Sequence, residues 1–225
     1  INEFNMMPFF KSFSIRIIGY LPYIIFFYVI YTIEIFRELL LYNGLLQLML
    51  FLIVACIPAY LTKRMSYVDI AWPWGLVLIG ALVLLLGDGY KPRIFLISGM
   101  YLFSGLRMGI GALILLKKGH LDTELSRYTY QRRRWKKAGY KNLDISLQYE
   151  IMIQCFANIT FLAIPAILMS TNSTNSISTL EYIGVGLWAT WFVLEHISDL
   201  QKQQFLKKAF LEKKKKQVLK MKLYQ

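Results

Sequence analysis

Residues Val68–Leu86 carry the sequence VDIAWPWGLVLIGALVLLL, whose single charged side chain, Asp69, lies at its start. The hydrocarbon core of a bilayer requires about 20 consecutive, mainly apolar residues from a helix that crosses it. Because lipid offers no hydrogen-bond partners, backbone groups must bond to one another, which a helix achieves within one segment. The stretch therefore predicts a membrane-spanning α-helix.

Five further apolar blocks have a similar length. They are Ile17–Ile33, Leu39–Leu61, Ile94–Leu116, Leu147–Met169 and Leu180–Ser198. The chain of 225 residues is 56% hydrophobic, which excludes a disordered chain and disfavours a soluble enzyme. A β-barrel would show short alternating segments instead. The sequence therefore predicts an all-α, multi-pass membrane bundle of about six transmembrane helices.

Lysine and arginine are distributed unevenly between the two predicted sides of the membrane. Of 26 such residues, 22 lie on the side of the two termini, mostly in a basic loop at about 117–146 and in the tail. The other side holds Arg37, Lys91 and Arg93. Basic residues mark the cytoplasmic or matrix side, so we expect both termini there. We predict a membrane domain over residues 1–206, a basic tail over 207–225, and phospholipids, some of them anionic, rather than nucleic acid as partners.

Charged and ionisable side chains within spans are costly and mark candidate functional positions. Five occur here: Asp69, Arg107, Glu195, His196 and Asp199. Ser66 and Asp69 have capping-box spacing, so Asp69 is either a helix cap or a functional carboxylate. Arg107 either extends toward the basic side or pairs with a buried carboxylate such as Asp69 or Asp199. Glu195 and Asp199 share a helix face and form either structural contacts or one wall of a polar pocket.

No metal or nucleophile signature accompanies these charges. His120 and His196 are far apart in the sequence, and Cys56 and Cys155 lie in apolar blocks without metal-ligand spacing. The cysteines are most simply small buried apolar residues. We predict no metal site.

Four short segments resemble, in order, the motifs of one membrane-enzyme family. Val68–Gly75 resembles VDxxWxxG, Gly105–Arg107 resembles the start of GLRL, and Glu124–Tyr128 resembles EDxRY. Glu195–Phe205 resembles ExxxDxQxxxF. Their order and spacing resemble the steroid 5-alpha-reductase-like membrane family, in particular its uncharacterised branch.

The resemblance implies a helical membrane enzyme that transfers hydride from NADPH to a carbon–carbon double bond in a lipid. By matching position, the residues on the cofactor side would be Arg107, Arg127, Tyr128, Asp199 and Gln201. Asp69 and Trp72 would lie near the substrate cavity. Arginine suits the anionic phosphates of such a cofactor, and carboxylates orient ribose hydroxyls and arginines.

The sequence departs from the family after the DxQ segment. The family continues with a cofactor segment around Arg-His-Pro-Asn-Tyr, whereas this sequence has Lys220–Gln225 at that point. Half a cofactor pocket neither holds a dinucleotide tightly nor excludes water from a hydride. We therefore expect a non-catalytic accessory subunit of a larger membrane complex, with other membrane subunits as partners and lipid in the former substrate cavity. The alternative is an NADPH-dependent reductase whose remaining cofactor residues lie on another chain or outside this sequence.

Two further expectations concern class and location. A small transporter would also explain charges within spans, but no inverted repeat accompanies them. The sequence begins at Ile1, for which removal of an organellar presequence is one explanation. We expect the mitochondrial inner membrane, with the endoplasmic reticulum as the alternative.

Overall fold

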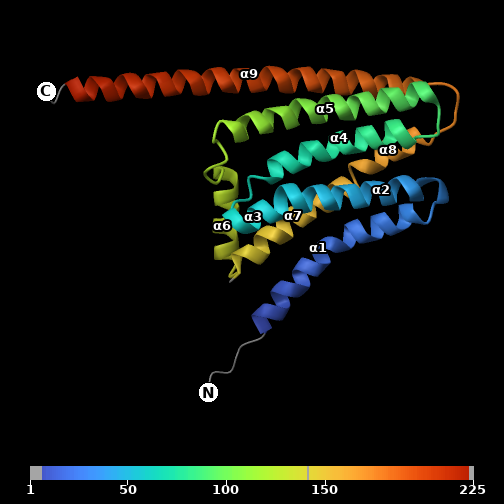
Figure 1. Ribbon diagram of the computed structural model, residues 1–225, viewed down its shortest axis with the longest axis horizontal. Helices are drawn as coiled ribbons and strands as arrows, with labels where there is room; N and C mark the ends of the chain where they lie inside the picture. Colours follow the sequence, from blue (N-terminus) through green and yellow to red (C-terminus); the bar gives the residue numbers. More distant parts are fainter. Residues whose placement is uncertain (1–6, 141, 223–225) are drawn as a thin grey trace. The chain divides into compact units, whose positions relative to one another are not determined.

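The computed structural model describes residues 7–140 and 142–222 (Figure 1). The elements are α1 (Met7–Tyr31), α2 (Glu34–Phe51), the π-helix η1 (Leu52–Cys56), α3 (Ile57–Thr62), α4 (Val68–Leu86), α5 (Lys91–Lys117), α6 (Ser126–Lys137), α7 (Leu143–Ile159), α8 (Ala163–Ser170) and α9 (Thr179–Lys222). No strand occurs in the described ranges, so the all-α prediction is confirmed. The chain divides into two compact units, residues 1–175 and 176–225, and each is described by itself.

Helices occupy all six predicted apolar blocks. Four helical segments of the described chain are long and apolar enough to cross a membrane: Glu34–Thr62, Val68–Leu86, Lys91–Lys117 and Leu143–Ser170. A fifth apolar helix, Arg16–Tyr31, is shorter. The apolar half of α9 contains Glu195 and His196, which lower its mean hydropathy. The multi-pass helical bundle is therefore confirmed, while two of the six crossings and the shared side of the termini stay predictions.

The last candidate span is broken between α7 and α8. Pro165, near the start of α8, lacks an N–H and its ring excludes the carbonyl one turn earlier, so a straight helix cannot continue. The released carbonyls find side-chain partners. Asn43 Nδ2 donates to the carbonyl of Ile159 at 3.2 Å. The Tyr101 hydroxyl donates to the carbonyl of Leu162 at 2.5 Å. Such compensation is what lets a membrane helix break within its span.

The π-helical turn η1 has a similar cause. Pro58 lies two residues after η1 and disrupts the regular hydrogen bonds of the preceding turn. Gln148 on α7 donates through Nε2 to the carbonyl of Cys56 at 3.0 Å. This bond ties α7 to the end of η1.

Three buried amide side chains, Asn43, Gln47 and Asn158, join α2, α4 and α7 within the bundle. We call them the amide cluster. Gln47 Nε2 donates to the carbonyl of Gly75 at 2.8 Å, and Asn158 Nδ2 donates to the carbonyl of Trp72 at 3.3 Å. A Cβ atom on Gly75 would lie 2.1 Å from Asn158 Nδ2. Glycine at this position therefore lets α4 approach the cluster.

α4 and α5 also pack closely. A Cβ atom on Gly105 would lie 2.8 Å from the carbonyl oxygen of Pro73, and one on Gly109 would lie 3.0 Å from Trp74 Nε1. Small residues permit such close approach of membrane helices. The contact holds Met108, between these glycines, beside α4.

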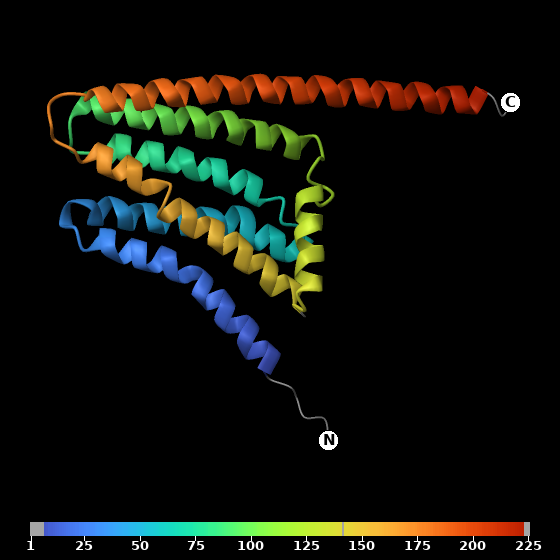
Figure 2. The same ribbon diagram turned by 180° about the vertical axis from the view of Figure 1, so that it is seen from behind.

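The helical bundle of the first unit has two ends, and connecting segments lie at each of them. Figures 1 and 2 show α6 lying across one end, next to the end of α3 and the start of α7. We call this the basic end, because α6 and its flanks carry most of the arginine and lysine of the unit. At the other end, the N–H of Gly89 donates to the carbonyl of Ser170 at 2.9 Å. Arg93, which is buried, donates to the carbonyl of Thr174 at 3.0 Å.

The predicted basic loop at 117–146 contains the helix α6, which the hydropathy pattern did not indicate. Its sequence, SRYTYQRRRWKK, is polar on most faces. The two apolar anchors are Tyr128 and Trp135, both buried. Packing against the bundle, rather than membrane insertion, therefore explains this helix.

The second unit consists mainly of α9. Ser178 and Glu181 form a capping box at its start: Glu181 N–H donates to Ser178 Oγ at 3.3 Å, and Ser178 N–H donates to Glu181 Oε2 at 2.7 Å. The helix continues without a break to Lys222. The predicted boundary between 206 and 207 stays a prediction.

Candidate functional site

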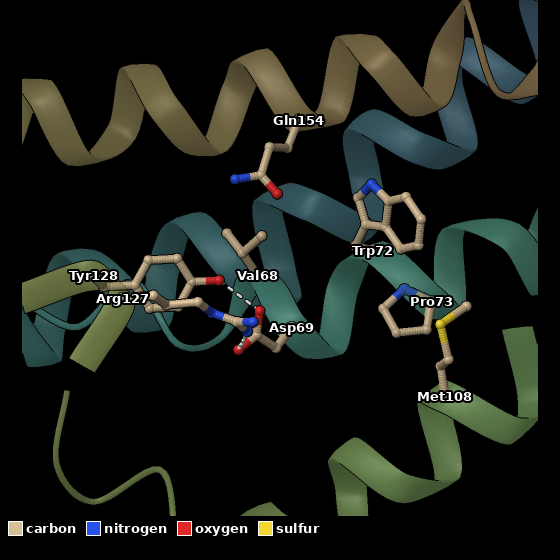
Figure 3. A pocket seen from close by; sticks show the side chains of 8 residues that line it. All are labelled: Val68, Asp69, Trp72, Pro73, Met108, Arg127, Tyr128 and Gln154. Carbon is tan, nitrogen blue, oxygen red and sulfur yellow. Dashed lines mark hydrogen bonds and ion pairs between the residues drawn. The ribbon is translucent and has the colours of Figure 1, made fainter. Parts of the chain in front are cut away.

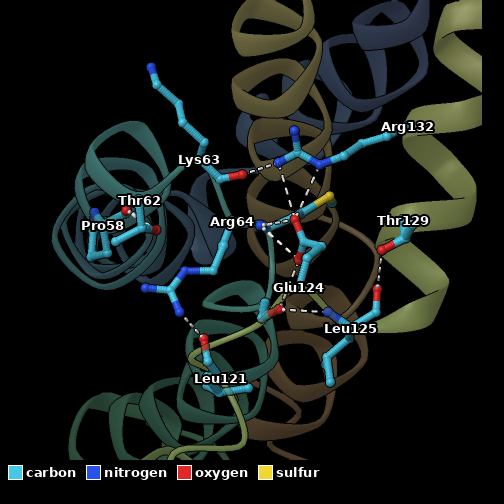
Figure 4. Close-up of polar contacts among 11 residues, drawn as sticks. Pro58, Thr62, Lys63, Arg64, Leu121, Glu124, Leu125, Thr129 and Arg132 are labelled. Atoms are coloured by element: carbon cyan, nitrogen blue, oxygen red, sulfur yellow. Dashed lines mark hydrogen bonds and ion pairs between the residues drawn. The ribbon is translucent and has the colours of Figure 1, made fainter.

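Glu124 joins the start of α4 to α6 (Figure 4). Its carboxylate accepts hydrogen bonds from the N–H of Met65 at 2.9 Å and from the hydroxyl of Ser66 at 2.8 Å. Arg132 on α6 adds an ion pair, with Nη2 at 3.1 Å from Glu124 Oε2, and donates to the carbonyl of Lys63. The side chains of Glu124 and Arg132 are 15% and 21% exposed. We call Ser66, Glu124 and Arg132 the Glu124 cluster.

The Glu124 cluster sets the position of the first turn of α6. Arg64 strengthens the connection, because its guanidinium donates to the carbonyl of Leu121 in the segment before α6. The second and third residues of α6 are Arg127 and Tyr128. Both side chains are thereby brought to the start of α4 (Figure 3).

Asp69, in the first turn of α4, is the partner of both side chains. The Tyr128 hydroxyl donates to Asp69 Oδ1 at 2.5 Å, and the Arg127 guanidinium forms an ion pair with Oδ2. The same guanidinium lies 4.9 Å from the centre of the Tyr128 ring. α4 has Tyr67 at its N-cap position, without a side-chain cap. Both carboxylate oxygens of Asp69 thus contact α6, and we call Asp69, Arg127 and Tyr128 the Asp69 cluster.

The charge state of this cluster follows from its surroundings. Burial, and then the negative charge of Asp69, raise the pKa of Tyr128 well above its ordinary value. Burial opposes the charge on Arg127, but the hydrogen bond and ion pair with Asp69 outweigh it and raise the pKa of Arg127. At neutral pH the cluster therefore holds a paired carboxylate and guanidinium beside a neutral phenol.

The Asp69 cluster forms one wall of a pocket of about 420 Å³. The other lining residues are Val68, Trp72 and Pro73 of α4, Met108 of α5 and Gln154 of α7 (Figure 3). Four of these five are apolar, so the wall opposite the charges suits a hydrocarbon body. The volume is within the usual range for small-ligand sites. The pocket can thus hold a molecule with one polar end and one apolar end.

Four of the predicted site residues meet in this pocket: Asp69, Trp72, Arg127 and Tyr128. Arg107 lies next to Met108 on α5, is half-buried, and does not line the pocket. Among the described contacts, Asp69 pairs with the residues of its cluster and not with Arg107. Asp199 and Gln201 lie on α9, in the second unit. The cofactor role of these three residues stays a prediction.

Sequence reasoning missed Gln154, Met108 and the anchoring role of Glu124. Gln154 lies four residues before Asn158, on the same face of α7. A search for neutral polar residues within the spans, beside the charged ones, would have found this pair. Met108 gave no signal, because an apolar residue in an apolar span is indistinguishable from its neighbours.

The NADPH role of the residues around the pocket stays a prediction. A dinucleotide requires cations for its phosphates. Here the Arg127 guanidinium pairs with Asp69, that of Arg132 with Glu124, and that of Arg64 with a backbone carbonyl. These three guanidinium groups already have partners within the chain, and we derive no step through this cofactor.

These features define a class: a multi-pass helical membrane protein with a small amphipathic pocket at the basic end of its bundle. The family model described as a protein of unknown function, DUF1295, matches residues 47–225. The chain belongs to this family, which is associated with steroid 5-alpha-reductase-like proteins. No curated protein and no solved structure matches the chain.

Proposed function

We propose that this protein binds a lipid in the basic-end pocket, with an oxygen atom of the lipid at Arg127 and Tyr128. The apolar body of the lipid packs against Trp72 and Met108. One observation supports this function. The pocket combines a polar wall, made of the uncharged Tyr128 phenol and the Asp69 carboxylate paired with Arg127, with an apolar wall.

The polar wall suits a neutral oxygen rather than an acid. Arg127 pairs with Asp69, so the Tyr128 hydroxyl can rotate from Asp69 to a ligand oxygen without leaving the carboxylate alone. The side chain of Arg127 is 62% exposed, and a guanidinium has five N–H donors. A carboxylate ligand would meet the negative charge of Asp69. A ketone or an alcohol is therefore the expected polar group.

The depth of the pocket also suits a lipid. Val68, Asp69 and Trp72 belong to the first turns of a candidate span, and α6 lies outside the spans. A lipid at this depth keeps its oxygen near the water interface and its hydrocarbon among the helices. Such a ligand enters from the bilayer rather than from water.

Fluorescent cholesterol bearing a nitrobenzoxadiazole group provides a test in detergent micelles. We expect saturable energy transfer from tryptophan, weakened by Trp72→Phe. Arg127→Gln should weaken binding by about tenfold, the usual value of one charge-assisted hydrogen bond. Arg133→Gln, on the exposed face of the same helix, is the matched control and should bind like the parent. Equal binding by both arginine variants would refute the proposal.

A second candidate is the lipid reductase activity that the family association suggests. The observation that favours it is the Tyr128 hydroxyl, which faces the pocket and keeps its proton at neutral pH. A phenol so placed can donate a hydrogen bond to a substrate carbonyl. NADPH consumption with a steroid enone, abolished by Tyr128→Phe and retained by Arg133→Gln, would support catalysis.

Lipid binding without catalysis corresponds to an accessory subunit of a larger membrane complex. In that case the purified protein binds the fluorescent sterol but does not consume NADPH, and it co-purifies with other membrane subunits after mild solubilisation. The two assays therefore separate the candidates. The organelle is a separate question, answered by fractionation.

A further inference from the structure

A second hollow shares no lining residue with the basic-end pocket. It has a volume of about 570 Å³ and is lined by α1, α2 and α7. Its walls include Phe27, Tyr31, Leu41, Gly44 and Phe156, and almost all of the lining is apolar. We call it the α1–α2 groove. Gly44 lies at its floor, where a Cβ atom would be 3.8 Å from both Phe27 and Ile159.

The groove runs along one face of α2. Leu41, Gly44, Leu45 and Leu48 line it at helical spacing. Leu41, Leu45 and Leu48 are exposed despite being apolar. On helices that cross a membrane, an exposed apolar groove faces lipid tails.

The same face of α2 continues into charged residues at the end of the span. Glu34, Arg37 and Glu38 precede Leu41 by seven, four and three residues, so they lie in line with the groove. Arg37 Nε donates to the carbonyl of Tyr31 at 3.3 Å, and its guanidinium lies 5.2 Å from the centre of that ring. Tyr31 itself lines the groove. One cation thus contacts the groove residue Tyr31 at the groove's end, and two carboxylates, Glu34 and Glu38, lie near it on α2.

We propose that the α1–α2 groove binds a zwitterionic phospholipid. One acyl chain lies along Leu41, Leu45 and Leu48, the phosphate meets Arg37, and the ammonium group meets Glu34 and Glu38. Charge complementarity selects this occupant, because two carboxylates and one guanidinium leave a net negative charge that disfavours an anionic lipid. This site lies on other residues than the basic-end pocket and does not depend on its function.

Photolabelling tests the proposal directly. The protein is placed in vesicles of equal phosphatidylethanolamine and phosphatidylglycerol, with a trace of either lipid carrying a diazirine on one acyl chain. We expect the phosphatidylethanolamine probe to label peptides containing Tyr31 and Leu45, and unlabelled phosphatidylethanolamine to compete. The phosphatidylglycerol probe should label them about fivefold less, the usual effect of one interfacial charge.

Filling the groove should remove the label. Gly44→Leu is expected to lower labelling by about tenfold, equivalent to displacing roughly two buried methylene groups. Gly99→Leu is the matched control, because a Cβ atom there meets nothing within 4 Å. Gly44→Ala, whose Cβ contacts are ordinary, covers the case in which the larger change prevents folding and should give a smaller loss.

A double variant tests the carboxylates at the charged end of the α1–α2 groove. Glu34→Gln combined with Glu38→Gln should abolish the preference for phosphatidylethanolamine while keeping some acyl-chain labelling. Labelling spread evenly over all apolar helices, a preference for phosphatidylglycerol, or crosslinks between two copies of the chain at this groove would each overturn the proposal.

Discussion

The amide cluster and the Glu124 cluster differ in charge, although they have the same structural role. Both join helices through buried polar side chains. Asn43, Gln47 and Asn158 lie within candidate spans and are uncharged. Glu124 and Arg132 are charged and lie outside the spans, at the basic end. In these two clusters, the polar groups within the spans are thus neutral, and the charged ones lie outside the spans.

The difference follows from the cost of desolvation. Interhelical hydrogen bonds between neutral groups contribute about 1 kcal/mol in membranes. Moving a charge into the hydrocarbon costs several kcal/mol unless it is fully paired. Glu124 combines backbone, hydroxyl and guanidinium donors, which is a complete shell for a carboxylate. We therefore expect the two clusters to respond differently to substitution.

The largest loss of stability is expected from Gly75→Ala, because the amide cluster leaves no space for an added methyl group. Gly75→Ala places a methyl group 2.1 Å from Asn158 Nδ2 and 2.6 Å from Gln47 Oε1. Both side chains must move and lose hydrogen bonds, at a cost of about 3 kcal/mol. The free energy of unfolding in detergent micelles measures it. Gly111→Ala is the control, since its Cβ meets nothing within 4 Å; equal effects would show that space is not the cause.

Removing the charge of Glu124 should have the next largest effect. Glu124→Gln leaves Arg132 without its carboxylate partner in a mostly buried site, and we expect a loss of about 2 kcal/mol in unfolding free energy. Lipid binding should weaken as well, because α6 then loses its anchor at α4. A variant as stable as the parent would mean that the Glu124 cluster does not hold α6.

A smaller effect is expected when the neutral hydrogen bonds of Asn43 in the amide cluster are removed. Asn43→Leu removes the donor to the carbonyl of Ile159 and the acceptor for Gln47. Neutral hydrogen bonds between membrane helices contribute little each, so the loss should be about 1 kcal/mol. A loss above that of Glu124→Gln would reverse the order of the two clusters.

The smallest effect is expected for the ion pair between Lys63 and Asp144, 2.8 Å apart and 50% exposed on each side. Asp144→Asn should change the unfolding free energy by less than about 0.5 kcal/mol, because water and salt screen exposed pairs. High salt should reduce this small value further. A loss comparable with that of Glu124→Gln would show that burial does not separate the two ion pairs.

The apolar blocks were sufficient to predict the apolar helices. Every membrane span needs a similar length of apolar residues, which can be recognised without a periodic pattern. They did not predict α6, which is held by Tyr128, Trp135 and the Glu124 cluster rather than by hydropathy. The charge pattern identified Asp69 but not its partner. As a partner for Asp69, Arg107 was the more obvious candidate, because it lies within a span and is nearer in the sequence than Arg127. Only the fold shows that α6 brings Arg127 to α4. Gln154 and Met108 required the packing of α5 and α7 against α4.

A photoreactive side chain inside the basic-end pocket gives the most direct test of lipid binding there. Trp72→p-benzoylphenylalanine places the crosslinker in the pocket, and Tyr130→p-benzoylphenylalanine places it on an exposed position of α6. After irradiation in native membranes, mass spectrometry identifies the adducts. We expect a lipid with a ketone or an alcohol at position 72 alone, reduced by Arg127→Gln. The same phospholipid adducts at both positions, unaffected by Arg127→Gln, would contradict a ligand site in this pocket.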